Sequence, residues 1–286
     1  MSTIKTYKRN NEFRNFLEKA FDTIYGNGWP ANLAYRLGFQ HTLEINSYDI
    51  CLDGNLCASS ALRIAFVADF HASQTTHPAL LANAFDKLQA IKPDLILIGG
   101  DFVTHNARHI DAIAEQLGKI TVPLGHYAVL GNHDYWTDPE YLAEKLRNAG
   151  IKVLINSNVQ LPGEHSKVWI CGLNDHRTGT ADPEATFSHA DGVRIVLMHA
   201  PDGLLFLKNH RFELAFCGHT HGGQISLPGG KPIITSHGVL NRKYNHGLYQ
   251  LQNRTNCRLI VSRGIGCAGL PIRINATSEI VICNVC

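Results

Sequence analysis

The chain has 286 residues, of which 44% are apolar and 17% are charged, and its formal net charge is +2. These values predict a globular protein with a substantial core and argue against a disordered chain. So small a charge gives no indication of nucleic-acid binding, and we expect none. The first thirty residues lack the apolar region of a signal peptide, and no apolar run approaches the ~20 residues of a membrane-spanning helix. We therefore expect a cytoplasmic protein.

Cysteines are scattered along the chain without a paired framework. The eight positions are 51, 57, 171, 217, 257, 267, 283 and 286. Several lie inside predicted strands, which indicates reduced, buried thiols in a cytosolic protein. The terminal Cys283-x-x-Cys286 has no second cysteine pair nearby and no βαβ context, so we interpret it as incidental.

The N-terminal segment predicts an amphipathic helix over residues 11–25, with three phenylalanines at helical spacing and several basic residues nearby. The helix either packs on the domain or lies at a membrane interface, as a peripheral contact with the inner membrane. Residues 44–52 predict an edge strand. We expect residues 1–60 to form this N-terminal part and residues 61–286 the main domain, within one compact unit.

Strands and helices alternate from residue 62 onward. Strands are predicted at 62–68, 94–98, 125–130, 168–171, 193–198 and 214–217, and helices at 78–91, at 107–118 and from about 137–140. This alternation is typical of an α/β sheet. Short strands predicted at 248–251, 258–262, 272–274 and 280–283 follow, and we expect them to complete a second sheet.

Polar residues follow five of the predicted strands directly. They are Asp69, His71, Asp101, Asn132, His133, His199, His219 and His221. In α/β sheets, ligands bind at the carboxyl edge of the strands. Each residue alone has an ordinary explanation as a helix cap, a turn residue or an exposed histidine, but five strand ends together indicate one site. The two imidazoles of Gly218-His219-Thr220-His221 can bind one metal, or one each of two metals.

The motifs Asp69-x-His71, Gly100-Asp101, Gly131-Asn132-His133-Asp134, His199 and Gly218-His219-Thr220-His221, in this order, resemble the calcineurin-like metallophosphoesterase superfamily over about residues 62–224. The resemblance implies an α/β fold, a four-layer α-β-β-α sandwich of two mixed sheets. The tail, with Gly222-Gly223-Gln224 and Leu270-Pro271-Ile272-Arg273, looks like the bacterial phosphodiesterase branch that includes a UDP-diacylglucosamine pyrophosphohydrolase.

The resemblance also implies a ligand set for two divalent metal ions. By motif, Asp69, His71 and His221 hold the first metal, Asn132, His199 and His219 hold the second, and Asp101 bridges them. Mixed nitrogen and oxygen ligands suit manganese, which we expect, with iron or zinc as alternatives. Such a pair lowers the pKa of a bound water and supplies hydroxide for in-line attack on phosphorus.

His133 is assigned to the substrate side, where it stabilises the phosphoryl oxygens or protonates the leaving group. The related protein phosphatases carry an aspartate and an arginine three and four residues after the bridging aspartate. This chain has Thr104 and His105 there. The sequence therefore does not identify what orients His133, and the missing arginine favours a diester or a pyrophosphate over a phosphoprotein.

We expect a phosphodiesterase or pyrophosphohydrolase, with a nucleotide-linked lipid such as UDP-2,3-diacylglucosamine as a candidate substrate. Two alternatives remain: a phosphomonoesterase acting on phosphoproteins or small metabolites, and a metal-binding scaffold without catalysis, which the complete ligand set disfavours. The tail contains four candidates for anion contacts, Arg242, Lys243, Arg263 and Arg273. The simpler interpretation is that these residues are scattered surface cations.

Overall fold

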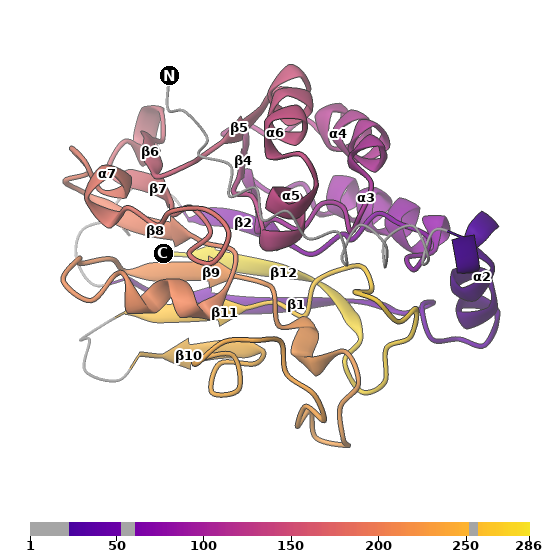
Figure 1. The fold of residues 1–286 in the computed structure, drawn as a ribbon. Helices are drawn as coiled ribbons and strands as arrows, with labels where there is room; N and C mark the ends of the chain where they lie inside the picture. The colour runs from indigo at the N-terminus through magenta and orange to yellow at the C-terminus, as the bar shows by residue number, and fades with distance from the viewer. Residues whose placement is uncertain (1–22, 53–60, 252–256) are drawn as a thin grey trace.

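The computed structural model describes residues 23–52, 61–251 and 257–286, so most of the helix predicted at 11–25 lies outside the described residues. Two six-stranded sheets form the centre of the molecule, in the orders β1-β12-β2-β3-β4-β5 and β10-β11-β9-β8-β7-β6 (Figure 1). Helices and short helical turns lie on the outer faces. The predicted α/β sandwich of two mixed sheets is confirmed.

The first sheet consists of β1 (Leu43–Ile50), β12 (Ser278–Val285), β2 (Leu62–Val67), β3 (Leu95–Ile98), β4 (His126–Ala128) and β5 (Ile151–Val153). Strands β2 to β5 are parallel, whereas β12 is antiparallel to β2 and parallel to β1. The four residues of β3 are all buried, which explains why parallel strands appear as continuous apolar runs in the sequence. β1 is an edge strand, as predicted, while the division after residue 60 stays a prediction.

Helices α3 (Pro78–Ile91), α4 (Ile110–Lys119) and α6 (Pro139–Asn148) lie together on one side of the first sheet (Figure 1). Proline in the first turn and a side-chain cap define the starts of α3 and α6: His77 accepts from the N–H of Ala79, and Asp138 accepts from that of Tyr141. Among the described helices, α2 (Trp29–Arg36), α5 (Asn132–Thr137) and the short α7 (Pro183–Thr186) were not anticipated.

The second sheet consists of β10 (Gly247–Gln250), β11 (Arg258–Val261), β9 (Leu214–Cys217), β8 (Val193–Leu197), β7 (Val168–Gly172) and β6 (Ser157–Gln160). The short helix α7 (Pro183–Thr186) and the 3₁₀ turn Pro201–Leu205 accompany it. Two expectations about the tail are wrong. The strand predicted at 280–283 belongs to β12 of the first sheet, and residues 272–274 contribute only an isolated bridge between Ile225 and Ile274.

Apolar side chains from both sheets fill the space between them. Phe66 of β2 and Phe216 of β9 are fully buried there, with ring centroids 5.2 Å apart. Burying one such side chain stabilises the fold by about 1.5–3 kcal/mol. This packing fixes the two sheets against each other and so fixes the relative positions of the loops that follow β2 and β9.

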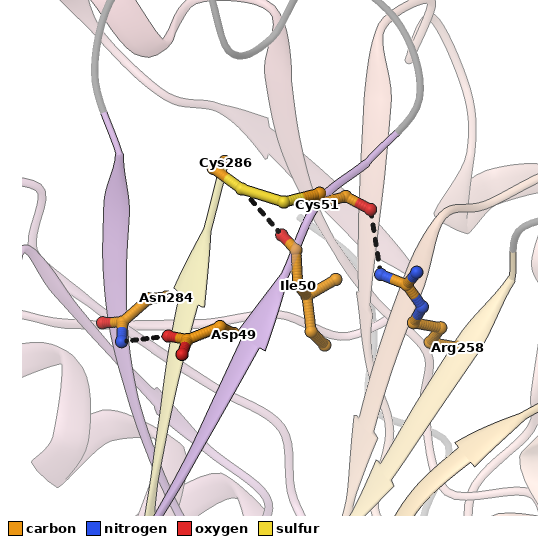
Figure 2. The surroundings of a disulfide bond; sticks show 6 residues. All are labelled: Asp49, Ile50, Cys51, Arg258, Asn284 and Cys286. Carbon is orange, nitrogen blue, oxygen red and sulfur yellow. Dashed lines mark hydrogen bonds between the residues drawn. A yellow bond between two sulfur atoms is a disulfide. The ribbon is translucent and has the colours of Figure 1, made fainter.

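A disulfide joins Cys51 to Cys286, across 235 residues of sequence (Figure 2). The residues just before them, Ile50 and Val285, are paired in the parallel β1–β12 ladder, so the two cysteines leave neighbouring strands side by side. The expectation that all cysteines are reduced is therefore wrong, because strand pairing brings together residues that sequence spacing separates. The remaining described cysteines, Cys171, Cys217, Cys257, Cys267 and Cys283, are free and buried, as predicted.

No helix within the described part of the chain combines the length and apolar character needed to cross a bilayer.

Candidate metal centre

The predicted site residues lie at one edge of the two sheets. Asp69 and His71 follow β2, Asp101 follows β3, Asn132 and His133 begin α5 after β4, His199 follows β8, and His219 and His221 follow β9. The seven predicted ligands are each no more than 9% exposed, and His133 is half-buried. The convergence expected from the strand ends is thus present in the structure.

The first group of potential ligands contains Asp69, His71 and His221, whose ligand atoms lie within 4.8 Å of one another. The Nε2 atoms of His71 and His221 are 3.1 Å apart. The carboxylate of Asp69 accepts a hydrogen bond from the backbone N–H of His219 at 2.9 Å, which ties this group to the neighbouring one.

The second group contains Asp101, His199 and His219, again within 4.8 Å. The Nε2 atom of His199 lies at the centre of this group. It is 3.0 Å from Asn132 Oδ1, 3.1 Å from His219 Nδ1 and 3.3 Å from Asp101 Oδ2. The same Asp101 oxygen lies 3.5 Å from His71 Nε2. One carboxylate oxygen therefore faces both groups, the position that a bridging ligand requires.

Contacts behind the histidines set which ring nitrogen faces the site. His199 Nδ1 donates to the carbonyl of Gly99 at 2.8 Å, and His71 Nδ1 lies 3.1 Å from Thr104 Oγ1. His221 Nδ1 lies 3.1 Å from the guanidinium of Arg273. An acceptor such as the Gly99 carbonyl fixes the orientation and tautomer of a metal-binding imidazole. The Arg273 guanidinium can only donate, so His221 Nδ1 accepts its hydrogen bond. In all three rings Nε2 faces the candidate centre.

The backbone at the site is unusual. A positive φ, which few residues other than glycine adopt, occurs at Asp69, His71, Asp101, His219 and His221, with values between 42° and 71°. Such conformations concentrate at functional sites. Glycine is required beside them: a Cβ on Gly131 would lie 2.2 Å from Asp101 Oδ1, and one on Gly218 would lie 2.4 Å from Asp69 Oδ2.

His133 is oriented by a backbone carbonyl. Its Nδ1 lies 3.1 Å from the carbonyl oxygen of Thr104, so Nδ1 carries the proton and donates it to that bond. Nε2 is then the nitrogen that can act on a substrate. The ring lies edge-on to His71, with centroids 4.8 Å apart, and the indole of Trp136 lies on another side at 4.8 Å. Thr104 thus contacts both histidines, one through its hydroxyl and one through its carbonyl.

Two buried carboxylates near the centre were not among the predicted site residues. Asp134 accepts hydrogen bonds from the N–H groups of Asp101 and Gly131, at 2.8 and 2.9 Å, and so holds together the loops that follow β3 and β4. Burial, together with the charge of Asp101, raises its pKa to about 8. Asp175 follows β7 and is only 2% exposed. The signal used for the other strand ends, a polar residue just past an apolar strand, would have found it.

The electrostatics of the site suit metal binding. Burial holds the pKa of His71 and of His221 well below the ordinary value and lowers that of His219 to about 4, so these imidazoles are neutral with lone pairs available. Burial also lowers the affinity of His199 for a proton, but the charge of Asp101 outweighs this and raises the pKa of His199 to about 10. Burial raises the pKa of Asp69 to about 7.

The pKa shifts of Asp69 and His199 indicate that the buried site favours additional positive charge. Two carboxylates buried together repel each other, and a proton held by His199 only partly offsets their charge. A divalent cation supplies the missing positive charge and takes the histidine lone pairs as ligands. The donor set of imidazole nitrogens, carboxylate oxygens and an amide oxygen therefore fits metal binding.

Two of the predicted anion contacts are wrong. Arg263 forms ion pairs with Glu44 at 2.6 Å and Glu279 at 2.9 Å. Arg273 is buried and donates to the carbonyls of Ala276 and Arg263, both at 2.9 Å, besides its contact with His221. Both guanidinium groups are used within the protein, whereas Arg242 and Lys243 are exposed.

Residues 62–223 match the family described as calcineurin-like phosphoesterase, so the chain belongs to this family and is a metallophosphoesterase. It is 29% identical over 278 residues to the uncharacterized metallophosphoesterase YkuE of Bacillus subtilis (strain 168), covering 94% of this chain and 96% of that one. Phosphodiesterase YaeI of Escherichia coli (strain K12) is 31% identical, over 78% of this chain and 82% of that one. UDP-2,3-diacylglucosamine pyrophosphatase LpxG of Chlamydia muridarum (strain MoPn / Nigg) is 27% identical, over 78% and 84%.

Proposed function

We propose that this protein hydrolyses phosphodiester or pyrophosphate bonds with the aid of two divalent metal ions, manganese being the best fit to the donors. The observation that carries the proposal is the position of Asp101, whose Oδ2 lies 3.3 Å from His199 Nε2 and 3.5 Å from His71 Nε2. A carboxylate between two histidine groups is suited to hold two cations side by side. When bound, such a pair lowers the pKa of water and neutralises charge on the phosphoryl group.

The ligands divide as the two groups suggest. Asp69, His71 and His221 would hold one ion, Asn132, His199 and His219 the other, and Asp101 both. Asn132 is neutral, so the second ion keeps more of its positive charge for a phosphoryl oxygen than it would beside a further carboxylate. The proposed division makes His219 and His221, two residues apart, ligands of different ions.

His133 would act on the substrate and not on the metals. Because its Nδ1 donates to the Thr104 carbonyl, Nε2 is the nitrogen that can meet a substrate. The ring lies beside the bridging position, since a nitrogen of His133 lies within 4.8 Å of ligand atoms of His71 and Asp101. From there it can donate a hydrogen bond to a phosphoryl oxygen or a proton to the departing oxygen. Its position in the first turn of α5, directly after Asn132, keeps this nitrogen at a fixed place relative to the second metal group.

A direct comparison of two substrates tests the proposal. Turnover of bis-p-nitrophenyl phosphate and of p-nitrophenyl phosphate is measured with added manganese, with a chelator, and after manganese is restored. We expect metal-dependent hydrolysis that favours the diester. A strong preference for the monoester would favour a phosphomonoesterase, and a protein that binds two metal ions but turns over no member of a broad phosphoester panel would favour a scaffold.

We further propose that the substrate is lipid-linked and that the protein meets it at an anionic membrane surface. Helix α2 exposes Trp29 and Leu33 one turn apart, and its C-cap residue Leu37 is exposed one turn further on; 53%, 49% and 64% of their surfaces are accessible. The helix projects from the right-hand edge of the molecule in Figure 1. Trp and Leu on one exposed helix face are typical of contact with a membrane interface.

A second apolar segment follows the ligand His221 in the chain. Ile233, Ile234 and Val239 are exposed there, beside the exposed cations Lys231, Arg242 and Lys243. Apolar side chains interleaved with basic ones suit a surface of anionic headgroups. The name LpxG, that of a UDP-2,3-diacylglucosamine pyrophosphatase, supports a nucleotide-linked lipid as the substrate class.

Sedimentation with anionic liposomes tests the membrane proposal. The triple variant Trp29→Ser/Leu33→Ser/Leu37→Ser should lose most of its bound fraction, since the substituted side chains are exposed and support no core. The matched control substitutes Glu140, Glu144 and Asn148, which have the same spacing on an exposed face of α6, with serine. Equal binding by both variants would contradict a role for α2. Deleting residues 1–22 measures the separate contribution of the predicted N-terminal helix.

A further inference from the structure

The exposed side chain of Arg177 contacts the indole of Trp136, which in turn contacts the imidazole of His133. Trp136 follows His133 by three residues in α5, which places both side chains on one side of that helix, with ring centroids 4.8 Å apart. The guanidinium carbon of Arg177 lies 6.0 Å from the centroid of the indole. The order outward from the metal centre is therefore imidazole, indole and guanidinium.

The loop that carries Arg177 is firmly held although the side chain is exposed. The carboxylate of Asp175 accepts hydrogen bonds from the backbone N–H groups of Arg177 at 3.1 Å and Thr178 at 2.7 Å. Tyr135 donates to Asn174 Oδ1 at 2.5 Å, which joins the loop to α5. The base of the Arg177 side chain is thus fixed relative to His133, while its end faces solvent.

The charge of Arg177 has no acidic partner in the described part of the chain. Among the described residues no carboxylate forms an ion pair with its guanidinium, in contrast to Arg263, which pairs with Glu44 and Glu279. Contact with an indole face orients a guanidinium and leaves its N–H groups available. Such a group is well suited to bind two oxygens of a phosphate.

We propose that Arg177, supported by Trp136, binds a second anionic group of the substrate, a phosphoryl group adjacent to the one that is hydrolysed. The proposal rests on the proposed phosphodiesterase activity and narrows its substrate class to pyrophosphate-type diesters. A simple diester carries one negative charge, which the metal centre meets, whereas a pyrophosphate diester carries a second that needs its own partner. Arg177 determines specificity and does not take part in bond cleavage.

Two substrates that differ only by one phosphoryl group test this subsite. They are the p-nitrophenyl ester of thymidine 5′-monophosphate and that of thymidine 5′-diphosphate, with products separated by chromatography. In Arg177→Gln, kcat/KM for the diphosphate ester should fall about 10–100-fold, mainly through KM, as expected for the loss of hydrogen bonds to a charged group. The fall for the monophosphate ester should be several-fold smaller. Arg177→Lys should recover part of the loss, and Arg147→Gln, on the exposed side of α6, should keep the wild-type ratio of the two substrates.

A binding measurement separates this proposal from the activity. Calorimetric titration of the manganese-loaded protein with inorganic pyrophosphate and with orthophosphate requires no turnover. Arg177→Gln should weaken pyrophosphate binding about 10-fold or more and orthophosphate binding much less. Equal weakening of both ligands, or of neither, would overturn the subsite. Failure of the wild-type protein to hydrolyse either ester would instead contradict the proposed function, and the two titrations would still decide the role of Arg177.

Discussion

Replacing Asp101 with asparagine is expected to lower kcat/KM for bis-p-nitrophenyl phosphate by at least about 10³-fold, since several kcal/mol of transition-state stabilisation depend on the metal pair. Its Oδ2 faces both histidine groups, and its Oδ1 accepts the backbone N–H of His133 at 2.8 Å. Asparagine keeps the shape and the acceptor for that N–H. It removes the negative charge that two cations would share.

Metal content and kinetics should be measured together for Asp101→Asn. We expect fewer metal ions per chain. Asp191→Asn is the matched control, because Asp191 is exposed and far from the site in the turn before β8. Full metal content with near-wild-type kcat/KM in Asp101→Asn would contradict a bridging role.

Replacing His133 with glutamine should lower kcat by about 10²–10³-fold while leaving the metal content unchanged. The reason is that His133 is not one of the seven proposed metal ligands. Its ring is held by the Thr104 carbonyl. If the imidazole protonates the leaving group, the loss should be larger for an alkyl ester than for a p-nitrophenyl ester, whose leaving group needs no proton. A loss independent of the leaving group would assign His133 to the phosphoryl oxygens.

The control for this experiment is His165→Gln, in the 3₁₀ turn between β6 and β7. It should retain wild-type turnover on both esters. A His133→Gln protein that binds a full complement of metal and turns over the diester at the wild-type rate would remove His133 from the reaction. Loss of metal in the same variant would instead place His133 among the ligands, as its proximity to His71 and Asp101 would then imply.

The sequence predicted the convergence of the site because one physical rule covers most of it. Parallel strands present their carboxyl ends at one edge, so the polar residues just past β2, β3 and β4 were expected to meet, as were those past β8 and β9. The packing of the two sheets brings the two sets together. The same rule applied to β7 would have added Asp175. The helix starts were also predictable, since proline and an aspartate cap mark α6.

Other features depend on contacts that leave no local signal. The bond that orients His133 is accepted by a backbone carbonyl, which every residue possesses, so Thr104 could not be recognised from its side chain. The disulfide between Cys51 and Cys286 depends on the parallel pairing of the first and last described strands. That pairing also explains the misplaced tail strand, because a buried apolar run does not reveal which of two sheets it joins.

Anomalous diffraction from crystals grown with manganese would locate the two proposed metal ions. We expect two peaks per chain, about 3.5–4 Å apart. One should be bounded by Asp69, His71 and His221 and the other by Asn132, His199 and His219, with an oxygen of Asp101 in contact with both. A single peak, or two peaks that His219 and His221 approach together, would contradict the proposal.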